Sequence, residues 1–273
     1  MSDDLTRALV FERWAVERTS TRIEPWAFGT AFFHDEFPKR YDANFVSVEQ
    51  PIENVASRVL AAEADRALAG FTHRKIEIDD DANGARVATG LAELGFAADR
   101  TVVMTLRREP DRPAELDRVE ELSFDEIRPH LVELNRREPW GSQPGVAEML
   151  ADFRKVLADR IGARFFAARA PDGSTIASSC ELYVHEDISQ VESVDTLLEH
   201  RGRGLARACV LRAATEARAA GASDVFIWAD AEDWPQQLYA RLGFDQIGYV
   251  RSFLKAPPAS EGEAVPGPTR ADE

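Results

Sequence analysis

Cysteine and long apolar runs are scarce in this sequence of 273 residues. The two cysteines, Cys180 and Cys209, stand far from any CxxC pattern, so we expect both to be small core residues in a reducing cytoplasm. The five histidines are scattered without the spacing of metal ligands, and no metal site is predicted. No window approaches the roughly 20 apolar residues of a membrane span, and no signal peptide is expected at the acidic start. These absences predict a cytoplasmic protein with no membrane partner.

Basic residues are in deficit, because 48 acidic side chains against 33 basic ones give a formal net charge of −15. A chain this acidic is repelled by phosphate backbones, so no nucleic-acid partner is predicted. Acidity of this size favours solubility and would also attract a cationic amine. The dense cluster of basic residues coincides with a glycine-rich motif and comprises Arg201, Arg203, Arg207 and Arg212.

Length and periodicity predict two α/β domains, since the chain suits two domains of about 120–140 residues. In the first half, helical spacing is found at 5–19, 51–68 and 82–94, and strand patterns at 29–33, 45–48, 73–78 and 101–106. In the second half, helices are predicted at 124–137, 146–159, 204–220 and 234–242, and strands at 118–122, 164–169, 176–183, 190–196, 225–229 and 246–254. The expected boundaries are a first domain over 1–108, a linker over 109–116, a second domain over 117–256 and a disordered tail over 257–273.

Two segments about 148 residues apart have similar sequences. Residues 90–96 read Gly-Leu-Ala-Glu-Leu-Gly-Phe, residues 238–244 read Leu-Tyr-Ala-Arg-Leu-Gly-Phe, and a strand pattern follows each. The long helices predicted at 51–68 and 204–220 have nearly the same offset. The halves are therefore expected to share one architecture, a twisted mixed sheet flanked by helices.

The most informative segment lies where a predicted strand ends, a short turn follows and a helix begins. Gly202 and Gly204 carry no side chains, so consecutive backbone N–H groups can face one anion at the helix N-terminus. The predicted ligand is a phosphate or pyrophosphate. A P-loop would need Lys-Ser/Thr where this chain has Leu205 and Ala206, and a dinucleotide-binding fingerprint would need a small residue in place of Arg207.

Two motifs together resemble those of the GNAT-type N-acetyltransferase superfamily. Arg201, Gly204 and Ala206 occupy the pattern Arg/Gln-x-x-Gly-x-Gly/Ala of its acetyl-CoA site, and about forty residues later a helix pattern bearing Tyr239 ends in Gly-Phe. The resemblance covers the second predicted domain, about half of the chain. It implies an N-acetyltransferase domain there and a degenerate GNAT-like first half, since residues 48–54 contain no glycine at the corresponding place.

One departure concerns the loop before the second motif. Many members of the superfamily carry an asparagine there that contacts the pantetheine arm, and residues 229–234 contain none. Asp233 is expected to cap the following helix instead, with Pro235 in its first turn.

The resemblance implies acetyl-CoA as cosubstrate and direct attack by an amine on the thioester in a ternary complex. It assigns the backbone of Thr196 and Leu197 to pairing with pantetheine and to polarising the carbonyl. It assigns Tyr239 to protonation of the departing thiolate, with a packing tyrosine as the alternative. The predicted cofactor-binding residues are Thr196, Leu197, Arg201, Gly202, Arg203, Gly204, Leu205 and Ala206.

Glu192 is the predicted general base, because strand alternation places it on one face with Val194 and Thr196. Asp195 is expected on the opposite face and Glu199 on the turn, so both rank lower. The alternative for Glu192 is an exposed glutamate of the sheet without a catalytic role.

Two functions remain open at this point. One is an N-acetyltransferase acting on a small-molecule or peptide amine, and the other is a non-catalytic acyl-CoA-binding or sensing protein that lacks a working acid or base. Trp140, between two predicted helices, is a candidate for lining the acceptor site, with core packing as the alternative. The sequence leaves the acceptor amine and a homodimer open.

Overall fold

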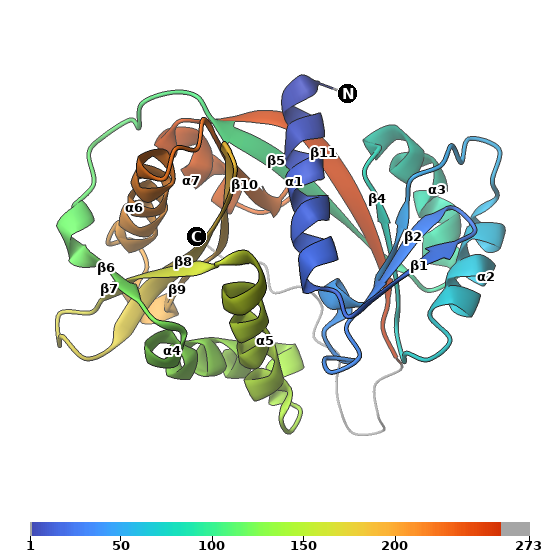
Figure 1. Ribbon diagram of the computed structural model, residues 1–273, viewed down its shortest axis with the longest axis horizontal. Helices are drawn as coiled ribbons and strands as arrows, with labels where there is room; N and C mark the ends of the chain where they lie inside the picture. Colours follow the sequence, from blue (N-terminus) through green and yellow to red (C-terminus); the bar gives the residue numbers. More distant parts are fainter. Residues whose placement is uncertain (1, 258–273) are drawn as a thin grey trace. The chain divides into compact units, whose positions relative to one another are not determined.

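The computed structural model describes residues 2–257, without the side chains of Trp140 and Ser142 (Figure 1). The predicted tail, apart from its first residue, and the side chain of Trp140 lie outside the described part. The chain forms a larger compact unit of residues 2–15, 103–228 and 234–247, and a smaller one of residues 16–102, 229–233 and 248–257. Among residues 2–257, no helix combines the length and the hydropathy that a membrane-spanning segment requires.

The larger unit holds most of the second half of the chain and the start of α1 (Asp3–Thr19). Its helices are α4 (Phe124–Arg137), α5 (Val146–Ile161), α6 (Leu205–Ala219) and α7 (Pro235–Leu242), and short 3-10 turns cover Leu116–Arg118, Pro139–Ser142 and Leu198–His200. Its strands are β6 (Val119–Leu122), β7 (Arg164–Arg169), β8 (Ile176–His185), β9 (Ile188–Thr196) and β10 (Asp224–Asp230). Their order is β10-β9-β8-β7-β6, with β10 parallel to β9 and the other neighbours antiparallel.

The smaller unit is a mixed sheet packed against two helices, α2 (Ser57–Ala67) and α3 (Asp81–Glu93). Its strands are β1 (Arg22–Trp26), β2 (Gly29–Phe33), β3 (Phe45–Val48), β4 (Arg74–Ile78), the beginning of β5 (Ala97–Leu106) and the end of β11 (Phe244–Lys255), in the order β1-β2-β3-β4-β11-β5. A 3-10 turn covers Tyr41–Ala43. Its core includes Leu60, Ile76, Val87, Leu91 and Phe253, all fully buried.

The two units interleave along the chain and do not follow the predicted boundaries. The strands β5 and β11 each contribute residues to both units. The end of β11, from Arg251 to Lys255, pairs antiparallel with β4, so the last described strand completes the sheet of the smaller unit. The sequence pattern predicts β11 as a strand but does not say with which strand it pairs.

Local signals account for several boundaries in the larger unit. A capping box begins α4: the Ser123 hydroxyl accepts a hydrogen bond from the N–H of Glu126 at 3.4 Å, and the Glu126 carboxylate accepts one from the N–H of Ser123 at 2.8 Å. Gly162, with φ of 69°, ends α5. The predicted hairpin between β7 and β8 is confirmed, and Gly173 in its turn has φ of 72°.

Three local predictions were wrong. The sequence pattern missed the edge strand β1, because Pro25 lacks a backbone donor and the apolar and polar residues of this strand do not alternate clearly. The helix predicted from residue 51 begins only at Ser57. The preceding residues form a turn instead, in which the buried Ile52 accepts a hydrogen bond at its carbonyl from the N–H of Val55 at 2.8 Å. Trp234 occupies the N-cap of α7 in place of Asp233, whereas Pro235 stands in the first turn as expected.

The hairpin turn predicts a pH-dependent contribution to stability. The N–H of Thr175, followed by its hydroxyl and the N–H of Ser174, lowers the pKa of Asp172 from 3.8 to about 2. Because the folded pKa is depressed, the stabilisation is fully present above pH 3.8 and is lost as the pH falls toward 2. We expect Asp172→Asn to unfold at lower urea concentration than wild type at pH 7, and the difference to shrink below pH 3.8. A difference that stays constant with pH would contradict this account.

Candidate functional site

The strands β9 and β10 pair only over their first halves. Paired residues extend no further than Val191 and Ile227, although β9 continues to Thr196. Within the described part of the chain, the second half of β9 therefore has an edge without a β10 partner. Such an edge presents unpaired N–H and C=O groups that can bond to an extended ligand.

A β-bulge lies in the same half of β9. Two of its residues, Ser193 and Val194, stand opposite a single residue of β8, Cys180. Ser193 has φ of 51°, in the left-handed region that a serine rarely adopts. The sequence pattern gave no sign of this extra residue.

The bulge changes which side chains share a face. Ser179 and Glu181, two residues apart on β8, lie on one face, and their partners across the bulge are Asp195 and Glu192. Glu192 and Asp195 therefore share a face, whereas Thr196 pairs with the next residue of β8 and lies on the other. The predicted alternation, which grouped Glu192 with Thr196 and opposed it to Asp195, was wrong because it assumed a regular strand.

The backbone at the end of β9 offers one donor toward the open edge. The N–H of Leu197 donates to the carbonyl of Ala177 at 2.9 Å, and its carbonyl accepts from His200 at 2.8 Å. Both backbone groups of Leu197, one of the two residues predicted to pair with pantetheine, are thus engaged. Successive peptide groups of a strand point to opposite edges, so the N–H of Thr196 points away from β8 and toward the edge that β10 has left. The carbonyl of Thr196 accepts from Arg201 Nε at 3.2 Å.

Beyond the 3-10 turn that follows β9, two glycines lead into α6. Gly202 and Gly204 have φ of 73° and 76°, and Gly204 is the N-cap of the helix without a side-chain capping bond. Within the described residues, no carbonyl accepts from the N–H groups of residues 202–206. A Cβ added to either glycine would meet no atom within 4 Å, so the space beside both α-carbons is open. The arrangement fits a phosphate or pyrophosphate group.

The arginines of this segment differ in role. Arg201 and Arg203 are exposed, and each uses one guanidinium nitrogen on a backbone carbonyl at 3.2 Å, which leaves further N–H donors for an anion. Arg207 is buried and forms an ion pair with Asp111 at 2.6 Å, so it is structural. Leu205 is buried beneath the turn, and Ala206 is partly buried.

Tyr239 is 5% exposed and lies on α7. Burial raises the pKa of its phenol, and the charges of Glu192, Cys180 and Asp195 raise it further. The phenol therefore stays protonated at neutral pH. Among residues 2–257 its hydroxyl has no hydrogen-bond partner, so the proton is available to a bound molecule.

Glu192 is partly buried and hydrogen-bonded through both carboxylate oxygens. One oxygen accepts from Gln190 Nε2 at 2.7 Å and the other from the N–H of Ser193 at 3.3 Å. Burial raises the pKa of Glu192 and the charge of Glu181 adds to the effect, while the hydrogen bond from Gln190 opposes it.

A buried ion pair lies beside the bulge. Arg154 of α5 contacts the carboxylate of Glu181, which is 2% exposed, at 2.6 Å, and donates to the hydroxyl of Ser193 at 2.7 Å. The hydroxyl of Tyr183 donates to the other oxygen of Glu181. These contacts hold the helix α5 against the bulged strand.

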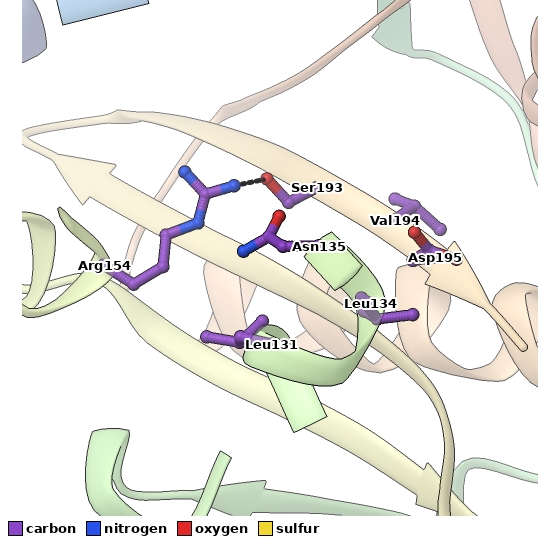
Figure 2. A pocket seen from close by; sticks show the side chains of 7 residues that line it. All are labelled: Leu131, Leu134, Asn135, Arg154, Ser193, Val194 and Asp195. Carbon is purple, nitrogen blue, oxygen red and sulfur yellow. Dashed lines mark hydrogen bonds between the residues drawn. The ribbon is translucent and has the colours of Figure 1, made fainter. Parts of the chain in front are cut away.

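A cavity of about 190 Å³ opens between α4, α5 and the bulge (Figure 2). Its lining residues come from α4, from α5 and from β9, and they are Leu131, Leu134, Asn135, Arg154, Ser193, Val194 and Asp195. Glu192 is not among them. Burial raises the pKa of Asp195, while the N–H of Thr196 and the charges of Arg201 and Arg137 lower it in part.

The structure brings most of the predicted site residues together and adds others. Thr196 and Glu192 of β9, the segment 201–206 that leads into α6, and Tyr239 of α7 lie around the open end of β9. Sequence reasoning missed Arg154 and Glu181, as well as the α4 residues of the cavity. A lone arginine or leucine on an amphipathic helix carries no signal of its role, since only the packing of α4 and α5 on β9 creates the cavity.

Comparison with known proteins bears on the fold of the chain. Residues 173–253 match the family model described as FR47-like protein. None of the curated proteins matches the chain. Among solved structures, a functionally unknown conserved protein from Staphylococcus epidermidis is 13% identical with a TM-score of 0.62, over 87% of this chain and 94% of that one.

Two further solved structures carry descriptive names. A GCN5-related N-acetyltransferase from Kribbella flavida is 15% identical with a TM-score of 0.59, over 94% of this chain and 96% of that one. A tandem GNAT protein from the clavulanic acid biosynthesis pathway is 15% identical with a TM-score of 0.52, over 78% of this chain and 75% of that one. At this identity the likeness concerns the fold. The predicted fold class, two tandem GNAT-like mixed sheets flanked by helices, is confirmed.

The buried ion pair yields a stability prediction. Arg154→Met leaves the carboxylate of Glu181 buried without its cation, and we expect a loss of about 3–5 kcal/mol in the free energy of unfolding. The double variant Arg154→Met/Glu181→Gln should recover most of that loss. Arg137→Met is the control, because its partners are exposed, and it should cost no more than about 1 kcal/mol. Urea denaturation of the four proteins measures these values, and a double variant as unstable as Arg154→Met would contradict the assignment.

Proposed function

We propose that this chain, whose fold is that of the tandem GNAT proteins, is an N-acetyltransferase that moves an acetyl group from acetyl-CoA to an amine. The observation that carries the proposal is the juxtaposition of two binding features at one end of β9. The unpaired edge at Thr196 suits an extended pantetheine arm, and the N–H groups of residues 202–206 suit the pyrophosphate. The FR47-like match over residues 173–253 includes both features.

The residues in the larger unit suit direct transfer in a ternary complex. The N–H of Thr196 would polarise the thioester carbonyl, and a donor of this kind can lower a barrier by about 3–4 kcal/mol. The amine nitrogen attacks the carbonyl carbon, the C–N bond forms and the C–S bond breaks. The phenol of Tyr239 would give its proton to the departing sulfur, and a carboxylate of β9 would take the proton lost by the amine.

The remaining expectations stay predictions. The acceptor is a small-molecule or peptide amine, the protein acts in the cytoplasm without a nucleic-acid or membrane partner, and a homodimer is open. The rival function, an acyl-CoA sensor, would bind acetyl-CoA and transfer nothing to any amine in a panel of acceptors.

The cofactor site is tested by Gly204→Glu, which places a carboxylate in front of the N–H groups of α6. We expect calorimetric titration to show acetyl-CoA affinity at least about tenfold weaker than in wild type, because the new charge repels the pyrophosphate. Gly145→Glu is a matched control, since Gly145 also has φ of 76°, is also a helix N-cap and also has no atom within 4 Å of a built Cβ. Equal affinities of wild type and Gly204→Glu, or no binding to wild type, would refute the site.

Tyr239→Phe tests the proton donor. We expect the rate of acetyl transfer to fall by about 100-fold, because the thiolate must leave without a proton, while acetyl-CoA affinity stays within about twofold. The rate of transfer is measured as the release of free thiol at saturating amine. The acetyl-CoA affinity is measured by calorimetry. An unchanged rate would assign Tyr239 to packing alone.

A further inference from the structure

We propose that Asp195, and not Glu192, takes the proton from the acceptor amine, and that the cavity lined by Asp195 binds that amine. The inference rests on the proposed acetyl transfer and names the residue and the place of its proton transfer. It reverses the ranking that a regular strand would suggest.

Only one of the two candidate carboxylates lines the cavity. Asp195 lines the cavity between α4, α5 and the bulge, whereas Glu192 does not (Figure 2). Both oxygens of Glu192 already accept hydrogen bonds from protein groups, Gln190 Nε2 and the N–H of Ser193. Asp195 has no ion pair with any described residue. An ammonium group entering the cavity therefore meets Asp195 as its available anion.

The bulge places Asp195 next to the reacting groups. Because Ser193 and Val194 together oppose one residue of β8, the side chain of Asp195 lies on the cavity face instead of the opposite one. The next residue is Thr196, whose N–H lies close enough to lower the pKa of Asp195. The charge of Asp195 in turn raises the pKa of Tyr239. Base, carbonyl donor and acid thus belong to one neighbourhood.

Several charged groups face Asp195 or its cavity and set its proton affinity. They are Arg137 and Glu138 at the end of α4, Arg154 of α5, Tyr239 of α7 and Arg201 of the turn before α6. Glu192 lies on the same face of β9 but outside the cavity. Arg154 is held by Glu181 and Ser193, and Arg137 by Glu133 and Glu199. Burial is the largest influence and raises the pKa of Asp195, which makes it a stronger base than an exposed aspartate.

The proton balance of the step is complete. The carboxylate of Asp195 accepts one proton from the ammonium group, and the neutral nitrogen attacks the thioester carbonyl. The C–N bond forms as the C–S bond breaks, the sulfur receives the proton of Tyr239, and the nitrogen loses its second proton to solvent as it becomes an amide. Asp195 then releases its proton to solvent, and Tyr239 regains one from solvent.

Three variants test the assignment: Asp195→Asn, Asp195→Glu and Glu192→Gln. Each is assayed for acetyl transfer to an amine that wild type uses, from pH 6 to pH 9, and for acetyl-CoA affinity by calorimetry. We expect Asp195→Asn to lose about 100-fold in kcat at pH 7, and the deficit to narrow as pH rises, because more of the amine is then neutral without help. Asp195→Glu should recover part of the rate, and Glu192→Gln should stay within about fivefold of wild type with an unchanged pH profile.

The outcomes are separable. A 100-fold loss in Glu192→Gln that narrows with pH, or equal losses in Glu192→Gln and Asp195→Asn, would overturn the assignment, and the first result does so even if Asp195→Asn fails to fold. A deficit of Asp195→Asn that is the same at every pH would also overturn it. Absence of transfer by wild type to any amine would instead refute the proposed function itself.

Discussion

The site depends on the bulge in β9, which the ion pair of Arg154 with Glu181 supports. A serine in the left-handed region costs on the order of 1–3 kcal/mol, so neighbouring contacts must hold it there. Arg154 donates to the Ser193 hydroxyl and at the same time neutralises Glu181, which is 2% exposed. One guanidinium therefore fixes the strained residue and satisfies a buried charge. Without that contact a regular β9 would place Asp195 on the opposite face.

The end of β9 combines two kinds of binding group that come from different causes. The open edge at Thr196 exists because β10 pairs with β9 no further than Ile227. The proposed anion site arises because Gly202 and Gly204 take left-handed conformations and leave the first N–H groups of α6 without acceptors. The first feature is set by sheet geometry and the second by two glycines. The proposed cosubstrate, with an extended amide arm and a pyrophosphate, would use both.

The sequence predicts the features that local signals determine and misses those that depend on pairing between distant strands. The helix α4 and the strand β7 have the predicted bounds, because capping and alternation are local signals. The glycines of the anion site were also readable, since only glycine adopts their φ without strain. The bulge could not be predicted, because the alternation of a short strand fits the sequence equally well with or without one extra residue. The pairing of β11 with β4 was not predictable either, because it depends on contacts between residues 173 to 181 positions apart.

The smaller unit shows why an echoed architecture need not repeat the site. Its parallel strands β3 and β4 stay paired up to Val48 and Ile78, the last residues of both, so no edge opens between them. The N–H groups of Glu49 and Gln50, which follow β3, both donate to the carbonyl of Phe28 at 2.9 and 3.1 Å. An anion at this turn would have to displace those bonds and would meet the charge of Glu49. The same order of elements thus gives a closed turn in one unit and an open one in the other, which is why the proposed chemistry belongs to the larger unit.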